Sequence, residues 1–214
     1  MSTKLQLALD DIDRDAIFPL LDQVAGQIDI VEVGTPLVIR YGVELARRIK
    51  QRYPALAVLC DVKIMDAAYY ESELAFEAGA DYATILALTD DGSVVDSVRA
   101  AADHGKRIMA DLICVPDLVA RARQLQEMGV HVVAVHTGVD QQAQGRTPLD
   151  DLRTLAESDL RVPLAVAGGV TSETAPAYLA LKPAILIVGG GITGAPDPAA
   201  EAIRLRRIIE GANQ

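Results

Sequence analysis

The chain has 214 residues, of which 50% are apolar and only 4% aromatic, and its formal net charge is −10 at pH 7. The negative charge argues against binding to the phosphate backbone of nucleic acid, and the scarcity of aromatic residues predicts a core of small aliphatic side chains, typical of a buried parallel sheet covered by helices. Since no apolar run approaches the roughly 20 residues that span a bilayer and the start lacks the apolar segment of a signal peptide, we expect a soluble, cytoplasmic protein without membrane contacts.

Eight short β-rich runs recur along the chain, with helical segments between them. The runs cover residues 5–10, 28–34, 57–63, 82–87, 107–113, 132–138, 163–169 and 184–189. The segments between them carry apolar residues at helical spacing, for example Leu118, Ala122, Leu125 and Met128. A glycine that could end a helix precedes three of the runs, at Gly79, Gly105 and Gly129.

Eight strands alternating with eight helices predict a (β/α)8 TIM barrel. A doubly wound open sheet is the alternative, but the regular repetition favours closure. The length allows one domain or two, and without a linker or low-complexity segment we expect a single barrel domain over residues 1–214. Active sites of such barrels lie at the carboxyl ends of the strands.

Charged and polar side chains gather at the predicted strand ends. Those ends carry Asp10, Glu32, Asp61 with Lys63, Asp111 and His136. Because the carboxyl ends of barrel strands form one rim, these groups are expected to converge. Charges in such a buried position are costly unless they are paired or used, so the pattern favours a ligand site.

The segment 61–66 (DVKIMD) is the most informative of these strand ends. Alternation along an extended chain sends Asp61 and Lys63 to the same side, so both can face one pocket. Asp66 lies beyond the strand and can point elsewhere, even into a neighbouring subunit. Taken alone, the segment is equally compatible with a structural ion pair in which Asp66 caps the next helix.

Two kinds of chemistry are expected at this rim. Glu32 and Asp61 offer hard oxygen ligands to a divalent cation, and Mg2+ usually takes only one or two protein carboxylates. His136 has a side chain suited to general acid–base work near neutral pH, although it can also be a hydrogen-bonded structural residue. His104 and His131 show no zinc-ligand spacing with the cysteines, and both are expected to be structural or solvated.

The last two strands end in glycine, at Gly168-Gly169 and at Gly189-Gly190-Gly191. Glycine allows close backbone approach to a ligand, and the loops after the seventh and eighth barrel strands often bind phosphate. Two tight turns would give the same pattern. The polar loop 140–146 is either a partial cover for the site or an ordinary exposed loop. Cys60 and Cys114 lie in apolar runs and are expected to be reduced core residues.

Four segments together resemble a known family. Residues 61–67 contain the D-x-K-x-x-D signature of the orotidine 5′-monophosphate decarboxylase superfamily, and residues 134–143, 165–169 and 187–193 are similar to its 3-hexulose-6-phosphate synthase branch. The resemblance extends from Leu5 to about Ile208. The first signature identifies the superfamily, and the other three select the branch.

The resemblance implies an aldehyde-lyase that adds formaldehyde to D-ribulose 5-phosphate in a Mg2+-dependent aldol reaction through a 1,2-enediolate. It further implies a homodimer with shared sites, in which Asp66 reaches the partner's site. Carried over by position, Glu32 and Asp61 would hold the metal and Lys63 would stabilise developing charge. His136 would move protons, with Asp111 as its orienting partner or as an alternative base. The implied phosphosugar-binding residues are Asp10, Gly168, Gly169, Gly189 and Gly190.

Two other functions remain open from the sequence. One is 3-keto-L-gulonate-6-phosphate decarboxylase, which also forms an enediolate. That relative carries arginines where this chain has Val139 and Gly190, so the departures weaken the decarboxylase interpretation. The other is a non-catalytic phosphosugar-binding barrel, which would keep the glycines but would not need Lys63 and His136 together.

Overall fold

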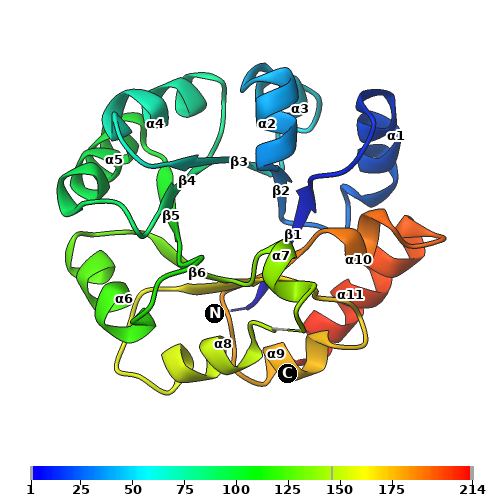
Figure 1. Ribbon diagram of the computed structural model, residues 1–214. Helices are drawn as coiled ribbons and strands as arrows, with labels where there is room; N and C mark the ends of the chain where they lie inside the picture. Colours follow the sequence, from blue (N-terminus) through cyan, green and yellow to red (C-terminus); the bar gives the residue numbers. More distant parts are fainter. Residues whose placement is uncertain (1, 146, 213–214) are drawn as a thin grey trace.

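The computed structural model describes residues 2–145 and 147–212, in which eight parallel strands close into a barrel (Figure 1). Each strand pairs with the next, and β1 pairs with β8 to complete the ring. The strands are β1 (Lys4–Leu9), β2 (Ile30–Val33), β3 (Ala57–Ile64), β4 (Tyr82–Leu86), β5 (Arg107–Asp111), β6 (Val132–His136), β7 (Leu164–Ala167) and β8 (Ile185–Val188). The predicted (β/α)8 barrel is confirmed, and each strand lies within or next to its predicted run.

Eleven helices are present among the described residues, three more than expected. They are α1 (Arg14–Val24), α2 (Thr35–Tyr41), α3 (Glu44–Arg52), α4 (Ala68–Glu77), α5 (Asp91–His104), α6 (Leu118–Glu127), α7 (Val139–Gln142), α8 (Leu149–Ala156), α9 (Ala175–Leu179), α10 (Gly190–Thr193) and α11 (Pro198–Ala212). Gly42, with a φ of 67°, separates α2 from α3, and the four-residue helices α7 and α10 are too short to show a helical period. None of the helices in these ranges is long and apolar enough to cross a membrane.

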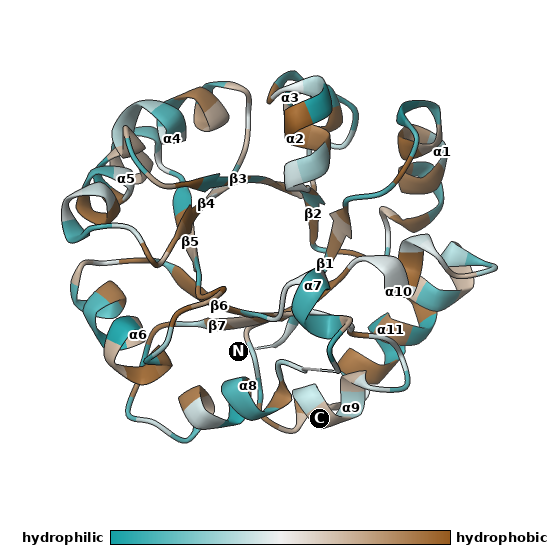
Figure 2. Ribbon diagram, in the orientation of Figure 1, coloured by the Kyte–Doolittle hydropathy of each residue, from teal (hydrophilic) through white to brown (hydrophobic). Residues whose placement is uncertain are grey.

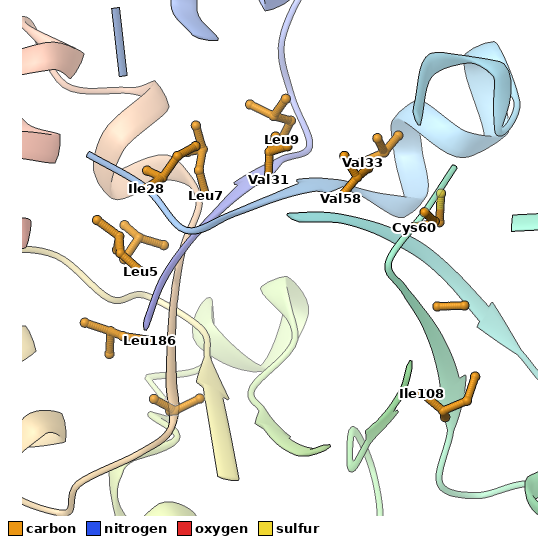
Figure 3. Close-up of a cluster of buried hydrophobic side chains, with 14 of the residues drawn as sticks. Leu5, Leu7, Leu9, Ile28, Val31, Val33, Val58, Cys60, Ile108 and Leu186 are labelled. Carbon is orange, nitrogen blue, oxygen red and sulfur yellow. The ribbon is translucent and has the colours of Figure 1, made fainter. Parts of the chain in front are cut away.

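Alternate side chains of each strand divide the core into two layers. Outward-facing residues such as Leu5, Leu7 and Val58 pack against the helices (Figure 3). Inward-facing residues form a smaller cluster that includes Leu59 and Met109. Strands that are buried on both faces read as nearly continuous apolar runs, whereas the helices carry both hydrophobic and hydrophilic residues (Figure 2).

The cysteine prediction is correct for one residue and wrong for the other. Cys60 is buried on the outer face of β3, whereas Cys114 is exposed. Cys114 follows the end of β5 and adopts a φ of 61°, so the apolar run in which it lies leaves the sheet before reaching it. The run therefore predicted burial for a residue that belongs to a loop.

One recurring contact ties the amino ends of three strand pairs. The residue just before an even-numbered strand accepts a hydrogen bond from the backbone N–H of the second residue of the preceding strand. The pairs are Leu5 N with Asp29 Oδ2 (2.8 Å), Val58 N with Asp81 Oδ2 (2.9 Å) and Ile108 N with His131 Nδ1 (3.1 Å). The contact fixes the end of the barrel opposite the carboxyl rim.

His131 can make this contact only while Nδ1 is unprotonated, because a protonated ring nitrogen cannot accept a hydrogen bond. Burial of the imidazole, assisted by the charge of Arg107, lowers the pKa of His131. The neutral form is therefore favoured in the folded protein. A histidine with a depressed pKa stabilises the fold fully above its unfolded pKa of about 6.5, and this contribution is lost as the pH falls below that value.

The substitution His131→Asn tests this contact. In asparagine, as in histidine, an acceptor atom is attached to Cγ, so Oδ1 can replace Nδ1 as the acceptor, but the asparagine side chain does not titrate. The free energy of unfolding of the wild type, measured by urea denaturation, should fall more between pH 7.5 and pH 5.5 than that of His131→Asn. The other titrating groups are common to both proteins and cancel in the comparison. Equal losses in the two proteins would show that His131 does not act in this way.

Candidate active site

A cavity of about 690 Å³ opens at the carboxyl ends of the strands. Small inward side chains, Ala8, Ala134 and Ala167, leave this space above the packed residues Leu59 and Met109. All but one of the predicted site residues line it, namely Asp10, Glu32, Asp61, Lys63, Asp111, His136, Gly168, Gly169, Gly189 and Gly190. The structure therefore brings these residues together on one rim.

Four of the lining side chains form a connected polar chain from β3, β5 and β6. Lys63 Nζ lies 2.6 Å from Asp61 Oδ2 and 3.3 Å from Asp111 Oδ2. Asp111 Oδ2 lies in turn 2.8 Å from His136 Nδ1. Lys63 therefore bridges two buried carboxylates, and Asp111 joins it to the imidazole.

The surroundings set the charges of Lys63 and Asp111. Burial opposes the charge of Lys63, but Asp61 and Asp111 outweigh it and raise the pKa of the ammonium. Burial also opposes the charge of Asp111, yet the hydrogen bond and electrostatic interaction with His136, followed by the charge of Lys63, lower the pKa of that carboxyl. Both groups are thus charged at neutral pH, and an ionised Asp111 can only accept hydrogen bonds.

That requirement assigns the proton on His136. Because the carboxylate of Asp111 accepts, His136 Nδ1 carries the hydrogen of their 2.8 Å contact. In the neutral ring, Nε2 is then the nitrogen with a lone pair. The arrangement can remove a proton from a ligand and return it, with the resulting imidazolium stabilised by Asp111.

Two further carboxyl groups line the cavity, Glu32 in its deeper part and Asp10 at its edge. Burial, followed by the charges of Asp61 and Asp10, raises the pKa of Glu32 well above its usual range. Burial and the charge of Asp61 also raise the pKa of Asp10. Glu32 Oε2 accepts a hydrogen bond from Gln6 Nε2 at 2.6 Å. The cavity thus contains more carboxyl groups than the cationic side chains present can neutralise.

The donor set fits a hard divalent cation. Among the described residues, no group of three histidine, cysteine, aspartate or glutamate side chains is arranged to hold a metal. Glu32 and Asp61 nevertheless supply two carboxylates with unfavourable mutual repulsion, and Mg2+ commonly takes one or two protein carboxylates with waters or substrate in its remaining positions. A cation between them would relieve that repulsion.

Glycine backbone forms the side of the cavity contributed by β7 and β8. Gly168 and Gly169 have φ values of 118° and 66°, which other residues rarely adopt. Their amide N–H groups donate no hydrogen bond to another described residue. Gly190 and Gly191 begin α10, whose first N–H groups lack intrahelical acceptors. This wall can offer several N–H donors to an anion.

Asp66 lies apart from the other predicted site residues. Its side chain is exposed and does not line the cavity. The helix cap proposed as an alternative is wrong, because Ala67, in the left-handed conformation, is the N-cap of α4 and no side chain caps that helix. Asp66 therefore does not contribute to the cavity of its own barrel.

Some lining residues were not predicted from the sequence. They include Gln6, Thr35, Thr84, Thr171 and Thr193, together with Gln142 from the polar loop. Gln6 was detectable as a polar residue inside an apolar strand, but isolated threonines carry no comparable signal. In the loop 140–146, Gln142 reaches the cavity and donates to the Thr137 carbonyl at 2.7 Å; Arg146 lies outside the described residues.

Gly34 is required at the cavity edge because Asp10 occupies the space beside it. A Cβ atom at position 34 would overlap the Asp10 carboxylate and lie 2.5 Å from the Leu9 carbonyl oxygen. We expect Gly34→Ala to displace Asp10 and to reduce the free energy of unfolding by about 1–3 kcal/mol in urea denaturation. Gly26→Ala is the control, since nothing lies within 4 Å of its added Cβ. Equal stability of the two variants would contradict this packing.

Comparison with known proteins agrees with the geometry. Residues 3–205 match the orotidine 5′-phosphate decarboxylase / HUMPS family. The 3-hexulose-6-phosphate synthase of Bacillus subtilis is 41% identical over 206 residues, covering 96% of this chain and 98% of that protein.

Two solved structures separate the branches of the family. The crystal structure of 3-hexulose-6-phosphate synthase from Salmonella typhimurium superposes with a TM-score of 0.96 at 47% identity, over 98% of this chain and 100% of that one. A 3-keto-L-gulonate-6-phosphate decarboxylase from Vibrio cholerae gives a TM-score of 0.87 at 25% identity, over 99% of each chain. The chain belongs to the orotidine 5′-phosphate decarboxylase / HUMPS family.

Proposed function

We propose that this chain catalyses the 3-hexulose-6-phosphate synthase reaction, the aldol addition of formaldehyde to D-ribulose 5-phosphate that gives D-arabino-hex-3-ulose 6-phosphate. The proposal is carried by one observation: a chain 41% identical to a named synthase over 96% of its length places Lys63 and His136 in one cavity, joined through Asp111. The ammonium and the imidazole supply the two functions that enediolate chemistry needs, charge stabilisation and proton transfer.

The chain's own residues account for the proton transfers. His136 Nε2 removes a proton from C1 of the ketose, and the electron pair moves into a C1–C2 enediolate. Lys63 stabilises the developing negative charge, because it is a protonated cation held at 2.6 Å from Asp61. C1 then attacks the carbonyl carbon of formaldehyde, and the new alkoxide takes up the proton from the imidazolium.

Glu32 and Asp61 would hold Mg2+ as the cofactor of this reaction. The fit rests on the two repelling carboxylates and on their hard oxygen donors. When bound, the ion supplies a Lewis acid for the substrate oxygens. Within the protein, Thr35 and Thr84 fix Asp61, since their hydroxyls donate to Oδ2 at 2.8 Å and to Oδ1 at 2.7 Å.

The phosphate of the substrate would bind at the glycine wall. Gly169, Gly189 and Gly190 offer backbone groups to it, and Gly168 supplies the turn that exposes them. Binding through backbone N–H groups is compatible with the acidic character of the chain, because the donors are local and carry no net charge. Asp10, at the cavity edge, would accept hydrogen bonds from the sugar hydroxyls.

The synthase is favoured over 3-keto-L-gulonate-6-phosphate decarboxylase by two residues. Position 190 is a glycine and position 139 a valine, where the decarboxylase resemblance requires arginines. Without these two arginines the site is less cationic, which suits formaldehyde, a small uncharged molecule, better than a substrate that carries a carboxylate beside its phosphate.

We also propose a homodimer with Asp66 at the shared site. Several apolar side chains are exposed near Asp66, on the loop after β3, on α4 and on the loop after β4: Met65, Tyr70, Leu74 and Leu88 are each at least 40% exposed. Grouped apolar side chains of this kind are typical of protein contacts. A single monomeric species in sedimentation velocity at assay concentration would contradict the dimer.

The reaction is tested by measuring formaldehyde consumption with D-ribulose 5-phosphate, with Mg2+ and with EDTA. We expect consumption that depends on both the sugar phosphate and the metal and that yields a hexulose phosphate. Omission of ribulose 5-phosphate is the control for non-specific loss of formaldehyde. No consumption under any metal condition would refute the proposal, and release of CO2 from 3-keto-L-gulonate 6-phosphate would then favour the decarboxylase.

A further inference from the structure

The strand that carries Lys63 is irregular at the point where it enters the site. Between β3 and β4, Cys60 pairs with Ala83 and Ile64 pairs with Ile85. The segment Asp61-Val62-Lys63 of β3 therefore lies opposite Thr84 alone. Two extra residues are accommodated in a bulge, and because the number is even, the inward and outward alternation of the strand is kept.

The bulge leaves Lys63 in an unfavourable backbone conformation. Its φ is 49°, in the left-handed region that side chains other than glycine rarely adopt. In a regular strand, residues two apart are separated by about 6.6 Å along the chain direction. The turned backbone instead lets the Lys63 ammonium fold back to 2.6 Å from Asp61 Oδ2. The left-handed conformation of Lys63 thus accompanies the short ion pair with Asp61 in the cavity.

A single hydroxyl spans the bulge. Lys63 N–H donates to Thr84 Oγ1 at 2.9 Å, and the same Oγ1 donates its hydrogen to Asp61 Oδ1 at 2.7 Å. Thr84 is only 4% exposed, so water does not readily replace it. Its side chain supplies the acceptor that a regular ladder would have offered to Lys63 and, at the same time, orients the Asp61 carboxylate.

We propose that Thr84 is a positioning residue, which holds Lys63 and Asp61 in reactive geometry across the bulge of β3. The inference rests on the function proposed above for Lys63 and Asp61. A hydroxyl is needed at this position because the contact requires one acceptor and one donor on the same atom. Serine satisfies that requirement, whereas valine, which has nearly the shape of threonine, does not.

The test compares Thr84→Val and Thr84→Ser with the wild type in steady-state formaldehyde consumption. We expect kcat of Thr84→Val to fall about 100-fold, the loss typical of a displaced reactive group, while KM for ribulose 5-phosphate changes less than threefold. Thr84→Ser should stay within about threefold of the wild type in kcat. Thr3→Val is the control, since it removes a buried hydroxyl that donates to the Pro183 carbonyl at the opposite end of the barrel, and it should leave kcat unchanged.

A wild-type kcat in Thr84→Val, or equal losses in Thr84→Val and Thr84→Ser, would overturn the proposal. If Thr84→Val does not fold, Thr84→Cys replaces it, because cysteine and serine differ only in the atom that bonds. Thr84→Cys should then lose much more kcat than Thr84→Ser, and equal values would contradict the role.

Crystal structures of the variants keep this test separate from the proposed reaction. Whether or not the wild type consumes formaldehyde, Lys63 should keep its positive φ in Thr84→Ser and should lose it in Thr84→Val or Thr84→Cys, with Nζ moving beyond 4 Å from Asp61 Oδ2. An unchanged Lys63 in every variant would show that the bulge does not depend on the hydroxyl.

Discussion

The ammonium of Lys63, placed between the carboxylates of Asp61 and Asp111, is the interaction on which the rest of the site depends. Bringing several carboxyl groups into a largely buried cavity is unfavourable unless positive charge accompanies them. Among the described residues that line the cavity, Lys63 is the only lysine or arginine. Burial, followed by the charges of Asp61 and Asp10, raises the pKa of Glu32, and the charge of Lys63 offsets only part of this. That imbalance favours a bound cation, and it also disposes the site to stabilise an anionic intermediate once the cation is present.

The barrel provides this arrangement through its geometry. Neighbouring parallel strands deliver their carboxyl ends to one rim, so that side chains far apart in the chain meet without long loops. Small inward-facing residues on β1, β6 and β7 keep the space of the cavity open. The outer layer of leucine, isoleucine and valine side chains supplies most of the apolar burial. The stabilising contacts at the opposite end, through Asp29, Asp81 and His131, are separate from the rim. These three contacts and the proposed chemistry therefore lie at opposite ends of the same strands.

Much of this could be predicted from the sequence, because the signals are periodic. Strand runs, their polar ends and the glycines after the last two strands predicted the barrel, the rim and its lining. The alternation of side chains along a strand correctly predicted that Asp61 and Lys63 lie on one side. The bulge between them could not be predicted, because an insertion of two residues keeps the inward and outward alternation of β3 unchanged. Thr84 was missed because an isolated threonine in a strand carries no signal of its own. Cys114 was misplaced because an apolar run does not reveal where its strand ends, and α7 and α10 are shorter than a helical period can detect.

We infer that this cavity forms an enediolate from ribulose 5-phosphate with the help of Lys63. Exchange of the C1 hydrogen in D2O without formaldehyde, followed by NMR, tests this role because it separates proton removal from carbon–carbon bond formation. We expect the wild type with Mg2+ to incorporate deuterium at C1 and Lys63→Ala to reduce the rate by orders of magnitude. Absence of exchange in the wild type, or exchange at an undiminished rate in Lys63→Ala, would contradict this role of Lys63.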